Sequence, residues 1–142
     1  MARTAERELA SEQIFCFSTP SRTRAMESDF YRWMFEGERV YQSLRSTHPL
    51  LGAPHFLGKA CFETFPHAIT CALLRNGVAS AKHKRIERRQ VLESAGINTA
   101  ALRSIDALDA ALCALTARFL MHNRIRTYGD VESGLIVVPI AD

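Results

Sequence analysis

The stretch "SIDALDAALCALTA", residues 104–117, predicts the helix around which the rest of the chain is arranged. Its large apolar side chains recur at helical spacing and form one stripe that can face a core. Asp106 and Asp109 lie about 60° apart around the same helix, on a face separate from that stripe. We expect the helix to run from about Ala100 to Asn123. The stripe consists of Leu108, Leu112, Leu115 and Phe119.

Outside this helix, short apolar strands alternate with further helices, which is typical of an α/β layered domain. Strands are predicted at Gln13–Ser18 ("QIFCFS"), at 59–65 in "KACFETFP" and at Gly134–Ile140, each stopped by a nearby proline. Helices are predicted at Arg3–Ser11, Ser21–Ser46 with Gly37 as a candidate break, His67–Leu74 ending at Asn76-Gly77, and Ser80–Ala95 before Gly96. The segment His48–Gly58 holds two prolines and two glycines and predicts a loop.

The composition is that of one globular domain spanning residues 1–142. Apolar residues make up 47% of the chain and charged residues 23%, which argues against a disordered, collagenous or membrane protein. The N-terminal stretch has mixed charge and no apolar signal core, so we expect a cytoplasmic protein without membrane contact. The four cysteines have neither CxxC spacing nor a histidine at ligand spacing, which predicts reduced thiols rather than disulfides or a zinc site.

The positive charge of the chain is concentrated in one helix. The stretch "KHKRIERR", residues 82–89, carries five basic residues and one glutamate, a net charge of +4 against +3 for the whole chain. Such a run is either a solvated helix face or a ridge that contacts phosphates, in which case binding should weaken as salt rises. No motif for reading a base sequence is present, so contacts to the nucleic-acid backbone are expected. The candidate residues are Lys82, Lys84, Arg85, Arg88 and Arg89.

The aspartate pair has a structural and a chemical explanation. Acidic residues in the first turn of a helix are stabilised by the macrodipole, by about 0.3–1 kcal/mol. Asp106, however, is expected well inside the helix, where two neighbouring carboxylates repel, and a divalent cation would relieve that repulsion. Mg²⁺ or Mn²⁺ prefers carboxylate oxygens, and Glu63 in the second strand is the candidate third ligand. Two such ions can support phosphodiester cleavage. His67, directly after "ETFP", is a candidate proton carrier or a surface residue.

Four motifs in order resemble one known family. "FETFPHA", "KHKRIERRQVL", "DALDAALCALTA" and "YGDVESGLIVVP" are similar to the domain of unknown function 429 family, described as predicted nucleases of RNase H-like fold. The resemblance covers about residues 13–139. It implies an α/β, RNase H-like fold and a hydrolase in which Glu63, Asp106 and Asp109 are catalytic and hold Mg²⁺ or Mn²⁺.

The chain departs from that family at its start. Members begin with a hairpin that carries a "GID"-like aspartate and continue to an "IDAP"-like strand, and nothing here corresponds to either. We therefore expect the C-terminal portion of the domain, without the hairpin and the central strand. A homodimer or a separate N-terminal segment would then cover the open sheet edge. Two functions follow: a metal-dependent nuclease or phosphodiesterase, or a non-catalytic module that binds nucleic acid or a protein.

Overall fold

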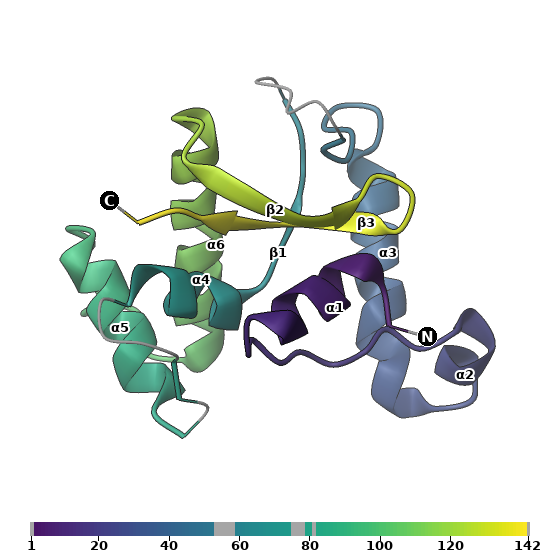
Figure 1. The fold of residues 1–142 in the computed structure, drawn as a ribbon, viewed down its shortest axis with the longest axis horizontal. Helices are drawn as coiled ribbons and strands as arrows, with labels where there is room; N and C mark the ends of the chain where they lie inside the picture. Colours follow the sequence, from purple (N-terminus) through teal and green to yellow (C-terminus); the bar gives the residue numbers. More distant parts are fainter. Residues whose placement is uncertain (1, 53–58, 75–78, 81, 142) are drawn as a thin grey trace.

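The computed structural model describes residues 2–52, 59–74, 79–80 and 82–141, and these residues form a mixed α/β fold (Figure 1). In chain order the helices and strands are α1 (Thr4–Ser11), α2 (Arg22–Met26), the 3₁₀ helix η1 (Asp29–Tyr31), α3 (Arg32–Leu44), β1 (Glu63–Thr64), α4 (Pro66–Leu73), α5 (Lys84–Ser94), α6 (Ile105–Met121), β2 (Ile125–Asp130) and β3 (Gly134–Pro139). The α/β class predicted from the sequence is therefore confirmed.

The sheet has the strand order β1-β3-β2, with β3 in the centre. Strands β2 and β3 form an antiparallel hairpin, whereas β1 pairs with β3 in parallel and places Glu63 opposite Ile136 and Thr64 opposite Val137. The Thr64 hydroxyl also donates a hydrogen bond to the Val137 carbonyl at 2.6 Å. The strand predicted at 59–65 is thus present as a shorter element. Strand β2, in contrast, was not predicted.

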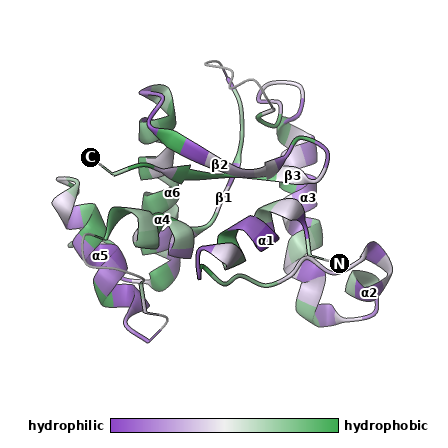
Figure 2. Ribbon diagram, in the orientation of Figure 1, coloured by the Kyte–Doolittle hydropathy of each residue, from purple (hydrophilic) through white to green (hydrophobic). Residues whose placement is uncertain are grey.

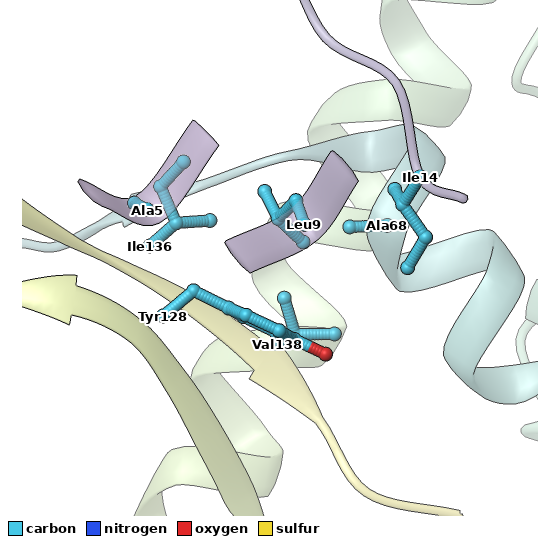
Figure 3. Packing of buried hydrophobic residues seen from close by; sticks show 7 residues of the cluster. All are labelled: Ala5, Leu9, Ile14, Ala68, Tyr128, Ile136 and Val138. Atoms are coloured by element: carbon cyan, nitrogen blue, oxygen red, sulfur yellow. The ribbon is translucent and has the colours of Figure 1, made fainter. Parts of the chain in front are cut away.

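Strand β3 is buried on both faces, because helices cover the two sides of the sheet. On one side, Ala5 and Leu9 of α1 pack over Tyr128, Ile136 and Val138, as Figure 3 shows. Successive side chains of a strand point to opposite faces. The alternate residues Ile125 and Val137 therefore pack on the other side, against Phe119 and Leu120 of α6.

A second core joins α4, α5 and α6 and contains the predicted stripe of the long helix. Leu108 and Leu112 are fully buried and Leu115 nearly so, together with Ile69 of α4 and Leu92 of α5. Figure 2 shows that hydrophilic and hydrophobic residues are interspersed along α5, and of the hydrophobic ones Val91 and Leu92 are buried in this core. The last turn of α5 leads into Gly96, whose φ of +79° suits the predicted helix end.

Two predictions in the N-terminal third of the chain are wrong. Residues 14–20 are extended but pair with no strand among the described residues, so the strand predicted at Gln13–Ser18 is not formed. The helix predicted at Ser21–Ser46 is divided into α2, η1 and α3, and the break lies at Glu27 and Ser28 rather than at Gly37. The reason is local, since the Ser28 hydroxyl accepts a hydrogen bond from the Phe30 N–H and starts a new helix.

Some predictions fall on residues outside the described part of the chain. These are most of the loop His48–Gly58, with His55, and the helix end at Asn76-Gly77. Within the described part of that loop, Leu50 makes a parallel bridge to Cys61. None of the helices in the described residues has both the length and the apolar character needed to cross a bilayer.

Candidate functional site

Glu63, the candidate third carboxylate, lies in β1 and is bound by an arginine from the N-terminal helix region. The two terminal nitrogens of Arg3 donate hydrogen bonds to the two carboxylate oxygens of Glu63, at 2.8 and 2.7 Å. The Arg3 Nε donates to Glu6 at 3.0 Å. These hydrogen bonds, first of all those to Glu63, raise the pKa of Arg3 above its already high ordinary value. A fork-shaped guanidinium matches a carboxylate in this way, so Glu63 has a built-in cationic partner.

Asp106 lies in the first turn of α6. α6 begins at Ile105, and the Ser104 hydroxyl caps it by accepting a hydrogen bond from the Ala107 N–H at 3.0 Å. The prediction that this helix starts near Ala100 is therefore wrong, and the argument that Asp106 lies inside the helix fails with it. Asp106 is exposed in the first turn. Its position there agrees with the macrodipole explanation.

Asp109 faces α5 and forms an ion pair with Arg88. The Arg88 side chain is only 10% exposed and that of Asp109 29%, so the pair is largely shielded from water. Burial raises the pKa of Asp109, the positive charge of Arg88 opposes that rise, and the charge of nearby Asp106 adds to it. Removing either partner would leave a charge without compensation in a partly buried place.

The predicted metal ligands do not assemble. Across the described ranges, no three His, Cys, Asp or Glu side chains are grouped so that they could hold a metal ion. Arg3 binds Glu63 and Arg88 binds Asp109, so two of the three predicted carboxylates already have a cation from this chain. The residues present therefore do not fit the Mg²⁺ or Mn²⁺ site that the resemblance implies.

Two further arginines of α5 have internal partners. Arg85 donates a hydrogen bond to the carbonyl of Arg103 at 2.5 Å. Arg89 donates to the Thr99 carbonyl at 2.8 Å, to the Thr99 hydroxyl at 2.6 Å and to the Leu102 carbonyl at 2.8 Å. With Arg88, they connect α5 to the segment before α6 and to α6 itself. All three predicted phosphate-contacting arginines therefore have partners within the fold.

The start of α5 carries the remaining basic side chains. Lys82 and Lys84 are exposed, and the ion pairs formed among the described residues do not include them. Ile86 in the same turn is also 68% exposed, whereas Val91 and Leu92 further along α5 are buried. The charge available to a ligand is therefore found at the N-terminal end of α5.

An open groove of about 800 Å³ lies next to this end of α5. Lys84 and Arg88 contribute its cationic side, and no carboxylate is found among its described lining residues. Its aromatic residues were not predicted as functional. Phe15 and Phe17 belong to "QIFCFS", which the strand prediction assigned to a sheet, and Phe65 belongs to the motif "FETFPHA". The groove is lined by Gln13, Phe15, Cys16, Phe17, Phe65, His67, Ala79, Lys84 and Arg88.

His67, the candidate proton carrier, lines the same groove. Its ring meets that of Phe65 edge to face, with the ring centroids 5.9 Å apart. Burial, and next the positive charge of Arg88, lower the pKa of His67 below its ordinary value. At neutral pH, His67 is therefore uncharged, and the positive charge of the groove comes from α5.

The four cysteines are free and partly buried. Burial raises the pKa of Cys16, which lines the groove, and likewise those of Cys71 and Cys113. A thiol with a raised pKa stays protonated at neutral pH and is a poor nucleophile. The cysteines therefore add no nucleophile to the groove.

A hollow of about 490 Å³ between α2 and α3 is less suited to a charged ligand. Two of its arginines are paired within the chain, Arg22 with Glu38 and Arg39 with Glu36. The hollow therefore carries both signs of charge. The groove beside α5 remains the better candidate site.

Comparison with known proteins identifies a family but no function. The model of the family described as "Protein of unknown function (DUF429)" matches residues 1–133. This match includes α1 and ends before β3, whereas the resemblance seen in the sequence ran from about residue 13 to residue 139. No curated protein and no solved structure matches the chain.

Proposed function

Since this chain belongs to the DUF429 family, whose function is unknown, we propose from the site itself that it binds nucleic acid through the phosphate backbone, without cleaving it by itself. The observation that carries the proposal is the groove beside α5, whose described lining combines the exposed Lys84 with aromatic rings and includes no carboxylate; Arg88, also in the lining, is paired with Asp109. A polyanion with flat rings is complementary to such a lining.

The position of the basic residues supports an anionic ligand. Four consecutive basic or histidine residues, 82–85, lie at the N-terminal end of α5, where the helix macrodipole is already positive. A cation there is unfavourable by about 0.3–1 kcal/mol when nothing compensates it. Glu87 compensates in part, and it also accepts a hydrogen bond from the Ser80 N–H at 2.8 Å. A bound phosphate would remove the remaining repulsion.

The carboxylates support binding rather than cleavage. A nuclease of the predicted kind would need Glu63, Asp106 and Asp109 to hold Mg²⁺ or Mn²⁺, and Arg3 and Arg88 would first have to leave the carboxylates that they bind. Both arginines are largely buried, with side chains 24% and 10% exposed, so that release is costly. The non-catalytic function is therefore the one we propose.

The test is a binding titration at several salt concentrations. The Kd is measured by fluorescence anisotropy at KCl concentrations between about 50 and 200 mM. The labelled oligonucleotide has about 20 nucleotides, because one binding surface covers roughly 4–16. We expect log Kd to depend linearly on log salt, and replacement of both Lys82 and Lys84 by Ala to reduce the slope by up to about 2. Lys59→Ala, at an exposed lysine away from the groove, is the matched control.

Two results would contradict the proposal. Binding that is indifferent to salt, or equally affected by Lys59→Ala and by the double substitution, would remove the α5 groove as the site. The same oligonucleotide incubated with Mg²⁺ or Mn²⁺ should stay intact. Cleavage that disappears in Asp109→Asn would instead establish the nuclease.

A further inference from the structure

We infer that the groove selects single-stranded nucleic acid, with bases stacked on Phe15 and Phe17 and phosphates held by Lys84. This inference rests on the proposed function and adds the class of ligand. It follows from the arrangement of the extended segment 14–18 beside α5.

The extended segment turns its aromatic residues outward. Ile14 is 7% exposed and belongs to the core under α1, and Cys16 packs against the same core. The alternate residues Phe15 and Phe17 are 71% and 84% exposed, and both line the groove. Alternate side chains of an extended segment point to opposite sides. Ile14 and Cys16 therefore attach the segment to the core, while the rings of Phe15 and Phe17 point away from it.

The exposed rings continue beyond the groove. The ring of Phe17 meets that of Phe30 in η1 edge to face, with the centroids 6.3 Å apart. Phe30 meets Tyr31 in the same manner at 5.1 Å. An edge-to-face contact covers one face of only one of the two rings, and Phe17 and Phe30 remain 84% and 60% exposed. We name Phe15, Phe17, Phe30 and Tyr31 the aromatic row.

Rings and cations in one groove match a single strand better than a duplex. A base in a duplex has both faces covered by its neighbours, so only its phosphates could reach Lys84. A single strand offers base faces to Phe15 and Phe17 while its backbone runs past α5. Stacking on an aromatic ring contributes to single-strand binding with any base, so no sequence motif is needed.

The groove favours this ligand over a protein. An apolar protein surface would cover the aromatic row but would leave the charge of Lys84 and of nearby Lys82 unmatched. A second copy of this chain is the competing occupant, because it would cover the same rings. The experiment therefore includes the oligomeric state.

The experiment compares the affinities of one single strand and its duplex, measured by anisotropy at the same salt concentration. We expect the single strand to bind at least about tenfold more tightly. Replacing Phe15 and Phe17 together by Ala should weaken single-strand binding about 10- to 100-fold, leaving duplex binding and the salt slope unchanged. Replacing both by Trp should retain the preference. Met121→Ala, at an apolar residue 75% exposed at the end of α6, is the matched control.

The outcomes separate this inference from the proposed function. If the single strand and the duplex bind equally and the phenylalanine substitutions have no effect, the inference is overturned. In that case the proposed function still holds if the salt slope depends on Lys82 and Lys84. No binding of either form overturns both. A dimer in sedimentation velocity that the phenylalanine substitutions dissolve would make the aromatic row a self-interface and overturn the inference. Unchanged circular dichroism shows that the variants are folded.

Discussion

Gly129→Ala should destabilise the protein more than a glycine substitution at any open position. Gly129 in β2 has a φ of +95°, and an added Cβ would lie 2.5 Å from the Gly134 carbonyl oxygen and 2.8 Å from the Ala5 Cβ. These atoms belong to backbone or to a one-carbon side chain, so none can move aside without shifting α1 or the hairpin. The Gly129 N–H also donates a hydrogen bond to Glu8 of α1 at 2.6 Å.

The magnitude is the sum of two effects. An alanine at positive φ costs roughly 1–2 kcal/mol, and forcing an extra carbon into a filled space costs typically 1–3 kcal/mol. The expected loss in the free energy of unfolding is therefore about 2–5 kcal/mol. Gly96 provides the matched control, since its φ is +79° and an added Cβ there meets nothing within 4 Å. Gly96→Ala should cost only the backbone part, about 1–2 kcal/mol.

Urea unfolding followed by circular dichroism measures both variants, with unchanged m-values as the check on two-state behaviour. The difference between the two losses measures the crowding of the added carbon by Gly134 within the hairpin and by Ala5 of α1. If Gly129→Ala and Gly96→Ala destabilise the protein equally, the close packing around Gly129 is incorrect.

Three other substitutions test the interior. Arg89→Lys should lower the free energy of unfolding by about 1–3 kcal/mol, because a lysine cannot reproduce the fork in which one nitrogen binds Thr99 and the other binds the Leu102 carbonyl. Leu112→Ala should cost about 2–5 kcal/mol by leaving a cavity at a fully buried position. Glu6→Gln should cost about 1–3 kcal/mol at neutral pH. Burial alone would raise the pKa of Glu6, but hydrogen bonds from Thr19 and Arg3 outweigh it and lower that pKa. Glu6 therefore stabilises the fold above its ordinary pKa of 4.5, and this contribution disappears as the pH falls through the lowered value. Urea titrations measure all three variants, with Glu6→Gln repeated down the pH scale.

Each of these tests has a control and a result that would contradict it. Arg39→Lys and Glu36→Gln alter an exposed pair on α3 and should change stability by less than about 0.5 kcal/mol. An Arg89→Lys variant as stable as Arg39→Lys would mean that the hydrogen bonds to residues 99 and 102 contribute nothing. A constant gap between Glu6→Gln and the wild type at all acidic pH values would mean that the pKa of Glu6 is not lowered. For Leu112→Ala, a loss below about 1 kcal/mol would place that residue outside the core.

The sequence predicts the helices well where apolar spacing and caps agree. The stripe of Leu108, Leu112 and Leu115 is found in the core because helical spacing alone decides which residues share a face. The start of α6 was predicted too early, because residues around Ala100 have helical composition, whereas Ser104 supplies the cap that fixes the boundary.

Strands were less predictable, because a strand needs a partner that its own residues do not specify. Residues 13–18 have strand composition, yet Ile14 is buried under a helix and its segment joins no ladder among the described residues. Strand β2 escaped prediction because its polar residues Arg126 and Thr127 weaken the apolar pattern. Its place is set by pairing with β3.

The candidate site depended most on contacts between distant residues. Arg3 and Glu63 are 60 positions apart, and nothing near either residue in the sequence indicates the other. The ion pair between Arg88 and Asp109 joins α5 to α6. The sequence predicted both helices, but it did not predict that they pack against each other. Spacing therefore located the carboxylates but could not identify the arginines that bind them.

The contacts of α1 also determine when this fold can be completed during synthesis. Glu8 binds Gly129 and Glu12 binds Tyr128, across 121 and 116 positions of the chain. Contacts of such separation close slowly, and proteins fold as they emerge from the ribosome with their N-terminal part first. Helix α1 therefore waits for the β2–β3 hairpin, which is made more than one hundred residues later, and until that hairpin emerges Ala5 and Leu9 present an uncovered apolar face to chaperones and proteases.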